Sequence, residues 1–210
     1  MKIIYIFQVD FVGGAELFAL DFLKFAARKS ELIAVISENA PKKFVEKIPK
    51  NVEKISMNLP RLNLRNLPKI FFTILKLRKI FKKNKNAKIV ANTVRTAILT
   101  NFAMKFSARK FYFFAHDFTF SKIFLRICEK KFTKIFAVSR AIKNDFLKKF
   151  STKFSREKIL KIANPAPQFS TKFEFQKNLK KFRVGIFSRI DRWKGHKIFL
   201  RAAQKVLREN

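Results

Sequence analysis

The chain of 210 residues carries 48 lysines and arginines against 14 aspartates and glutamates, and its formal net charge is +34. Because 48% of the residues are hydrophobic, the composition excludes a disordered chain, and the length fits one domain or one domain and part of a second. The charge favours a polyanionic partner, namely nucleic acid, anionic lipid or a phosphorylated substrate. Lys, Phe, Ile and Asn can also be encoded with A and T alone, so an AT-rich genome is an alternative explanation of the high positive charge.

Short apolar runs typical of strands alternate with longer runs typical of helices. This alternation predicts an α/β fold, a Rossmann-like parallel sheet with helices on both faces. Several strand runs are apolar throughout, as expected of strands covered on both sides. In chain order we expect strand 2–7, helix 14–29, strand 31–37, helix 41–48, strand 52–57, helix 66–84, strand 87–92, helix 94–107, strand 110–116, helix 118–131, strand 133–139, helix 140–150 and strand 158–164.

The character of the sequence changes after this series. Residues 1–164 are expected to form the first domain, and residues 165–181, with two prolines and no clear period, are typical of a linker. The apolar run that resumes at Phe182 predicts a strand, a turn and a helix over 182–210. One such unit cannot bury both of its faces, so we interpret it as the truncated start of a second domain.

The first candidate site is the glycine pair Gly13 and Gly14, between the first strand and the helix that follows it. Two glycines let a ligand approach the backbone, and the free N–H groups of a helix N-terminus favour a phosphate. Neither a GxGxxG nor a P-loop pattern is present. The alternative is an ordinary tight turn in which Glu16, in the first turn, complements the helix dipole. Spacing alone favours that alternative.

Two further candidates follow later strands. His116 and Asp117 come at the carboxyl end of a very apolar strand, where open α/β sheets bind ligands. A histidine there can donate a hydrogen bond to a sugar hydroxyl or a phosphate, or transfer a proton, and the alternative is a structural histidine. Ser139 is typical of a helix N-cap and is expected to be no more than that. Arg140 beside it is placed to meet an anion.

The last candidate is the turn of residues 188–196, SRIDRWKGH. Arg189 and Lys194 flank it, and Gly195 ends it. Arginine can grip a phosphate through two parallel hydrogen bonds, and lysine adds a point charge that neutralises a leaving pyrophosphate. The alternative is a pair of surface cations in a very basic chain. No Asp-x-Asp pair and no Cys/His cluster occurs in the sequence, so no metal site is predicted.

In their order and spacing these segments resemble the family-4 glycosyltransferases, the group 1 glycosyl transferases of GT-B architecture. The resemblance is carried by GGAE at 13–16, HD at 116–117, IFAVSRAIKNDF at 135–146, KILKIANP at 158–165 and VGIFSRIDRWKGHKIFLRAAQKV at 184–206. It covers most of this chain but only the first half of a family member. Asn164-Pro165 departs from the family's usual Asn-Gly.

The resemblance implies two Rossmann-like domains, of which the first takes the acceptor and the second a nucleotide-sugar. It implies that Gly13 and Gly14 close on the donor, that His116 lies near the transferred sugar as the catalytic residue, and that Arg189 and Lys194, with Gly195, hold the donor diphosphate. Glu16, Asp117, Ser139 and Arg140 would lie on the acceptor side or rim. Retention of configuration, transfer to a glycan or lipid-linked acceptor, and independence of metal and cofactor are also implied. The family's Glu-x7-Glu motif would lie beyond Asn210, so the chain is expected to be an incomplete, inactive part of the enzyme.

The expected location is the cytoplasm, with the inner face of the cell membrane as the alternative within it. The first apolar stretch has only five residues before Gln8, whereas a secretory signal needs roughly 7–15. The single cysteine, Cys128, fits a reducing compartment. Residues 66–86 place apolar residues 67, 70, 71, 74 and 81 on one face and lysines on another, which suits either anionic lipid or packing on the sheet. A non-catalytic basic protein that binds nucleic acid or membrane is the alternative function, although no specific nucleic-acid motif appears.

Overall fold

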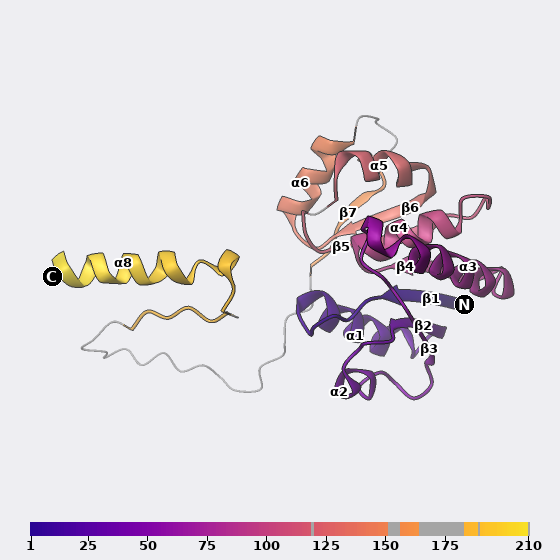
Figure 1. Cartoon of the computed structure of the whole chain (residues 1–210), viewed down its shortest axis with the longest axis horizontal. Coiled ribbons are helices and arrows are strands. Elements are labelled where there is room, and N and C mark those ends of the chain that lie inside the picture. Colours follow the sequence, from indigo (N-terminus) through magenta and orange to yellow (C-terminus); the bar gives the residue numbers. More distant parts are fainter. Residues whose placement is uncertain (119, 151–155, 164–182, 189, 210) are drawn as a thin grey trace. The chain divides into compact units, whose positions relative to one another are not determined.

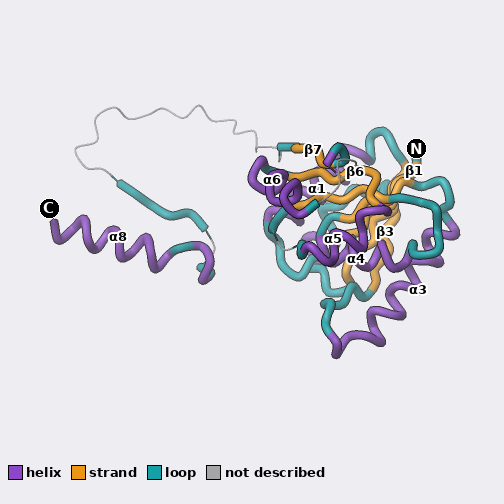
Figure 2. The backbone as a smooth tube through the Cα atoms, turned by 90° about the horizontal axis from the view of Figure 1, so that it is seen from above, coloured by secondary structure: helices purple, strands orange, loops and turns teal. Residues whose placement is uncertain are grey.

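In a computed structural model, the described residues are 1–118, 120–150, 156–163, 183–188 and 190–209. Their contacts divide the chain into two units, Met1–Ala166 and Pro167–Asn210. The first unit contains one sheet of seven parallel strands with helices around it (Figures 1 and 2), so the predicted α/β Rossmann-like fold is confirmed. The strands are β1 (Lys2–Phe7), β2 (Glu31–Ser37), β3 (Glu53–Met57), β4 (Lys88–Ala91), β5 (Phe111–Ala115), β6 (Phe132–Ala137) and β7 (Ile159–Lys161).

The helices lie between these strands, as the alternating pattern predicted. Their ends differ from the prediction by a few residues, and the expected helix 118–131 is a short α-helix followed by one 3-10 turn. The helices of the first unit are α1 (Gly14–Ala26), α2 (Lys42–Val45), the 3-10 turn η1 (Leu64–Asn66), α3 (Leu67–Lys83), α4 (Val94–Ala103), α5 (Lys122–Cys128), the 3-10 turn η2 (Glu129–Lys131) and α6 (Arg140–Lys149).

The strand order is β3-β2-β1-β4-β5-β6-β7, so successive strands are added first on one side of β1 and then on the other. From β1 the chain moves outward through β2 to β3, and it then returns across β1 to build β4 to β7. Right-handed crossovers therefore place α1 and α2 on one face and α3 to α6 on the other, as Figure 1 shows. Buried residues form a separate core on each face, with Phe18 and Leu23 of α1 in one and Leu77 and Phe146 in the other.

Helix α3 packs on the sheet through Thr73, Leu77 and Phe81, which are buried. The face expected to be apolar contained Leu67 and Phe71, but these side chains are 55% and 59% exposed. The helix therefore packs on the sheet through part of the expected face, since Phe81 is buried and Ile70 and Ile74 pack against the core. Within the described residues, no helix is both long enough and apolar enough to cross a bilayer.

The second unit contains the 3-10 turn η3 (Arg192–Lys194) and helix α8 (His196–Glu209). The predicted helix is present, but residues 183–188 are in no hydrogen-bonded strand. A strand requires a neighbouring strand, and no such partner occurs in the described part of this unit. The predicted linker 165–181 lies outside the described residues, so the boundaries at 164 and 182 remain predictions.

Candidate active site at the carboxyl edge of the sheet

The carboxyl ends of β1, β4 and β5 lie side by side, because these strands are parallel neighbours. The strand order reverses between β1 and β4, because β2 and β3 lie on one side of this point and β5 to β7 on the other. In open α/β sheets, ligands bind outside the carboxyl ends of the strands at such a reversal. The residues that follow these three strands, the loop 8–13, Asn92 and His116, therefore form the candidate site.

The loop after β1 ends at Gly13, and α1 begins at Gly14. The backbone N–H of Gly13 donates a hydrogen bond of 2.9 Å to Oε2 of Glu16, which is buried. This carboxylate stabilises the positive end of α1, as the ordinary-turn interpretation requires. Because it already neutralises part of that charge, the loop attracts a phosphate less strongly than a bare helix N-terminus would.

The two glycines have different surroundings. A Cβ atom on Gly13 would lie 3.0 Å from Cε2 of Phe11 and 3.1 Å from Oε2 of Glu16, so a larger residue would require both side chains to move by a few tenths of an ångström. At Gly14 the corresponding position has no described atom within 4 Å. Gly14 is therefore the point at which a ligand can approach the backbone closely.

Asn92, which is 1% exposed at the end of β4, connects the glycine loop to His116. Its Nδ2 donates a hydrogen bond of 3.1 Å to the carbonyl of Ala15 in the first turn of α1. Its Oδ1 accepts a hydrogen bond from the hydroxyl of Tyr5 and lies 3.0 Å from Nε2 of His116. One buried amide thus contacts the elements that follow β1 and β5.

These contacts determine the tautomer of His116. The carbonyl of Ala15 can only accept, so the nitrogen of the Asn92 amide must face it and the oxygen must face Tyr5 and His116. Nε2 of His116 therefore carries a proton and donates it to Oδ1. In the neutral imidazole Nδ1 is then left as an acceptor. Burial lowers the pKa of His116 from 6.5 to about 4, against a smaller raising effect of the Asp117 carboxylate, so the ring is neutral at pH 7.

This pKa predicts how stability depends on pH. His116 takes up a proton near pH 6.5 in the unfolded chain and only near pH 4 in the folded chain. Its contribution to the free energy of unfolding is therefore fully present above pH 6.5 and is lost as the pH decreases towards 4. Urea unfolding should show that the free energy of unfolding decreases by about 2 kcal/mol between roughly pH 7.5 and pH 5 because of this group. His116→Gln should remove that part of the slope. An unchanged slope in the variant would contradict the lowered pKa.

The structure separates the remaining candidates of the first unit. Asp117 is exposed next to His116. Ser139 accepts a hydrogen bond of 3.1 Å from the N–H of Ile142 and is the N-cap of α6, as expected of a purely capping residue. Arg140 begins α6 and is exposed, beyond the carboxyl end of β6. The Asn92 amide brings two of these candidates together, the glycine loop and His116.

The candidates of the second unit lie around η3. Lys194 is exposed, and its N–H donates a hydrogen bond of 3.0 Å to the carbonyl of Asp191. Gly195 has a φ of 76°, a left-handed conformation that favours glycine, and its carbonyl accepts a hydrogen bond from the N–H of Phe199 in α8. Arg189 lies outside the described residues. The proposed diphosphate roles of this turn remain predictions.

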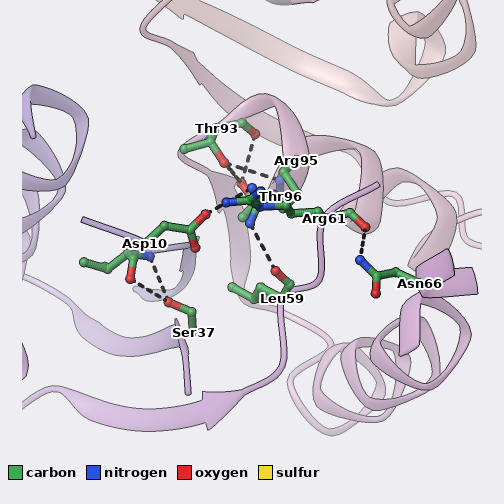
Figure 3. Close-up of polar contacts among 9 residues, drawn as sticks. Asp10, Ser37, Leu59, Arg61, Asn66, Thr93, Arg95 and Thr96 are labelled. Atoms are coloured by element: carbon green, nitrogen blue, oxygen red, sulfur yellow. Dashed lines mark hydrogen bonds and ion pairs between the residues drawn. The ribbon is translucent and has the colours of Figure 1, made fainter. Parts of the chain in front are cut away.

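A polar pocket of about 360 Å³ lies at the carboxyl ends of β1, β2 and β3. Figure 3 shows how Arg95, from the first turn of α4, supports it: Nη2 lies 3.2 Å from Oδ2 of Asp10, and Nη1 donates a hydrogen bond of 3.3 Å to the carbonyl of Leu59. These contacts hold the strand ends together, and the pocket suits a ligand with many hydroxyl groups. It is lined by Asp10, Ser37, Glu38, Asn39, Asn58, Leu59, Pro60, Arg61, Asn66 and Lys69.

Neither Asn92 nor Arg95 was predicted from the sequence as a functional residue. A signal for Asn92 was present, because it is a polar residue that ends an otherwise apolar strand, as His116 does. Arg95 carried no comparable signal, since it is one of 48 cations in the chain. Its role depends on the approach of loops that are distant in sequence.

Known structures share the fold of this chain, although no similar sequence is found. Neither a protein-family model nor a curated protein matches the sequence. HepE of Anabaena, solved with UDP and glucose, has a TM-score of 0.57 and 19% identity over 78% of this chain and 44% of its own. The lipopolysaccharide outer core galactosyltransferase WaaB has a TM-score of 0.58 and 18% identity over 81% and 47%. A putative UDP-N-acetylglucosamine 2-epimerase from Listeria monocytogenes has a TM-score of 0.55 and 11% identity over 75% and 43%.

WaaB is a galactosyltransferase, and the likeness supports the predicted GT-B fold, while membership of family 4 stays a prediction. At these identities the likeness shows the fold alone, and an epimerase shares it. The chain spans less than half the length of each of these structures. Any activity of a whole protein is therefore a matter for proposal.

Proposed function

We propose that the chain is part of a glycosyltransferase, of the family-4 group, which moves a sugar from a nucleotide-sugar donor to a glycan or lipid-linked acceptor with retention of configuration. The observation that carries the proposal is the Asn92 amide, which holds the glycine loop and His116 together at the reversal of the sheet. That the structural neighbours include a galactosyltransferase, and a protein solved with UDP and glucose, supports it.

In this proposal His116 acts as a hydrogen-bond acceptor for a hydroxyl of the transferred sugar. Its Nε2–H is already donated to Asn92, and its lowered pKa leaves the ring neutral, so it is not an acid at neutral pH. Gly14 gives the donor access to the backbone of the loop. The polar pocket beside Asp10 and Arg61 suits the hydroxyl groups of an acceptor.

The second unit supplies the remaining donor contacts in this proposal. Lys194 and Arg189 neutralise the diphosphate as charge develops on the leaving nucleotide, with Gly195 shaping the turn. The chemistry uses neither a metal nor a cofactor, since these cations take the part that a metal ion would have. We propose that the enzyme works in the cytoplasm, and that residues 1–210 alone do not catalyse transfer.

Donor binding by the intact protein tests this function against nucleic-acid binding. In calorimetric titration with UDP-sugars, the double variant Lys194→Gln and Arg189→Gln should weaken donor binding at least about tenfold, because charge-assisted contacts to a diphosphate are strong. Affinity for single-stranded DNA should be nearly unchanged, because it depends on the summed charge of 48 cations. The matched control is the pair Lys197→Gln and Arg201→Gln in α8.

Two outcomes would count against the transferase. If the intact protein binds no nucleotide-sugar, the function is wrong. If the control pair weakens donor binding as much as the Lys194 pair does, the turn has no specific role. Strong, sequence-independent and salt-sensitive DNA binding without donor binding would favour the basic nucleic-acid binder instead.

A further inference from the structure

An apolar groove of about 510 Å³ lies on the surface of the first unit, where η1 and α3 meet α4 and α5. Among the described residues that line it, Asn63 is the only polar one. Helix α3 packs on α4, and α4 packs on α5, so the groove belongs to one continuous face. The lining residues are Leu62, Asn63, Leu64, Leu67, Ile70, Phe71, Ile74, Ile98, Phe102 and Phe124.

The apolar side chains at the mouth of this groove are open to solvent. Leu64 is 83% exposed, Leu67 55% and Phe71 59%, and Phe124 on α5 is 37% exposed. They are not required for attaching α3 to the sheet, because Thr73, Leu77 and Phe81 do that. A cluster of large apolar side chains that the fold leaves in water marks an interaction surface.

The charge around the groove is of one sign. The four helical segments η1, α3, α4 and α5 contain ten lysines and arginines and no aspartate or glutamate. Arg65, Lys69, Lys122 and Arg126 are exposed on the segments that line the groove. Long basic side chains can keep their charge at a headgroup while their stems lie along apolar surface.

We propose that this face, defined as η1, α3, α4 and α5 with their exposed side chains, docks onto a bilayer that contains anionic phospholipid. Apolar tips surrounded by cations fit acyl chains below a layer of phosphates. A second copy of the chain fits less well, since it would bring two faces of the same charge together, each on a chain of net charge +34. The docking is peripheral, and the proposal does not depend on the transferase activity.

The position of this face gives the docking a consequence for the polar pocket. The segment 59–69 borders both: Asn66 and Lys69 line the polar pocket, and Leu64 and Leu67 line the groove. A protein docked in this way holds its polar pocket next to the headgroup layer. A substrate anchored in the bilayer can then reach the pocket with its polar part.

Vesicle flotation with the intact protein tests the proposal. Wild type should float with vesicles of phosphatidylcholine and phosphatidylglycerol and not with phosphatidylcholine alone. The double variant Leu64→Gln and Phe71→Gln should partition at least about tenfold less onto the anionic vesicles, since two apolar contacts are lost. Its urea midpoint should stay at the wild-type value, because both side chains are exposed.

The matched control is Leu17→Gln and Phe25→Gln on α1, on the opposite face of the sheet, where these side chains are 51% and 65% exposed. This pair should float like wild type. Equal flotation of wild type with both kinds of vesicle, or equal losses in the two pairs, would overturn the proposal. So would flotation that survives the Leu64 pair. None of these results would bear on donor binding, which the Lys194 experiment measures separately.

Discussion

In the proposed transferase, replacing His116 with alanine is expected to lower kcat for sugar transfer about tenfold, the size expected for the loss of one neutral hydrogen bond. The reason is the loss of Nδ1, the only ring nitrogen that the contact with Asn92 leaves available to a substrate. The KM for the donor should change much less, because the diphosphate is held by other residues in the proposed function. Initial rates with saturating acceptor would measure both constants.

The control for this prediction is His116→Gln. Glutamine can donate an amide N–H to Asn92 and still offer an oxygen as acceptor, so it should recover part of the lost rate. Both variants need urea midpoints near the wild-type value at neutral pH for the comparison to hold. Transfer by the alanine variant at the wild-type rate would show that His116 is a structural histidine.

Asn92→Ala should destabilise the first unit by about 3 kcal/mol, because it leaves buried polar groups without partners. The hydroxyl of Tyr5, which is fully buried, loses its acceptor, and the carbonyl of Ala15 loses a donor. Burial also raises the pKa of Tyr5 well above 10, so this hydroxyl stays protonated and cannot escape its cost by ionising. Urea unfolding at pH 7.5 would measure the loss.

A second variant distinguishes the cost of the unpaired Tyr5 hydroxyl from the cost of the packing lost at Asn92. Tyr5→Phe combined with Asn92→Ala removes the hydroxyl together with its acceptor, so the double variant should be more stable than Asn92→Ala alone by about 1–2 kcal/mol. A double variant that is no more stable than the single one would show that Tyr5 and Asn92 are not coupled. The stacking of Tyr5 on Phe22 is retained by phenylalanine, which makes the comparison a fair one.

The elements could be predicted from the sequence because their local signals agree. Strand β5, Phe111–Ala115, is apolar throughout and ends at a polar pair, and α6 starts with the N-cap that Ser139 was expected to provide. The predicted strand at 182–187 has no such support, since a strand exists only with a hydrogen-bonded neighbour. Its apolar sequence is a necessary condition and not a sufficient one.

The stripe by which α3 packs could be predicted only in part, since Ile70, Ile74 and Phe81 pack on the core but Leu67 and Phe71 do not. Apolar residues occur almost all round this helix, at Ile70, Phe71, Phe72, Ile74, Leu75, Leu77, Ile80 and Phe81. Periodicity therefore does not define a unique face. The choice of Thr73 as a buried contact depends on its hydroxyl, whose single proton is shared between the carbonyls of Asn58 at 3.0 Å and Lys69 at 2.8 Å. That pairing is visible only once the chain is folded.

The candidate site shows the same division. His116 and the glycine pair follow predicted strands, so their place at the edge of the sheet could be inferred. That Asn92 would lie between them could not, because it requires β4 to lie between β1 and β5. Strand order depends on the whole chain and cannot be predicted from any short segment of the sequence.

Two of the hydrogen bonds of the Asn92 amide, those with Ala15 and His116, have a thermodynamic consequence. A ligand that draws the carbonyl of Ala15 away from Nδ2 removes what orients the amide, and with it the acceptor that fixes the tautomer of His116. Occupancy at the first turn of α1 and proton uptake by the imidazole are then linked equilibria. Linkage is reciprocal, so acidification must change the affinity of that ligand by the same factor by which the ligand changes the proton affinity of the ring.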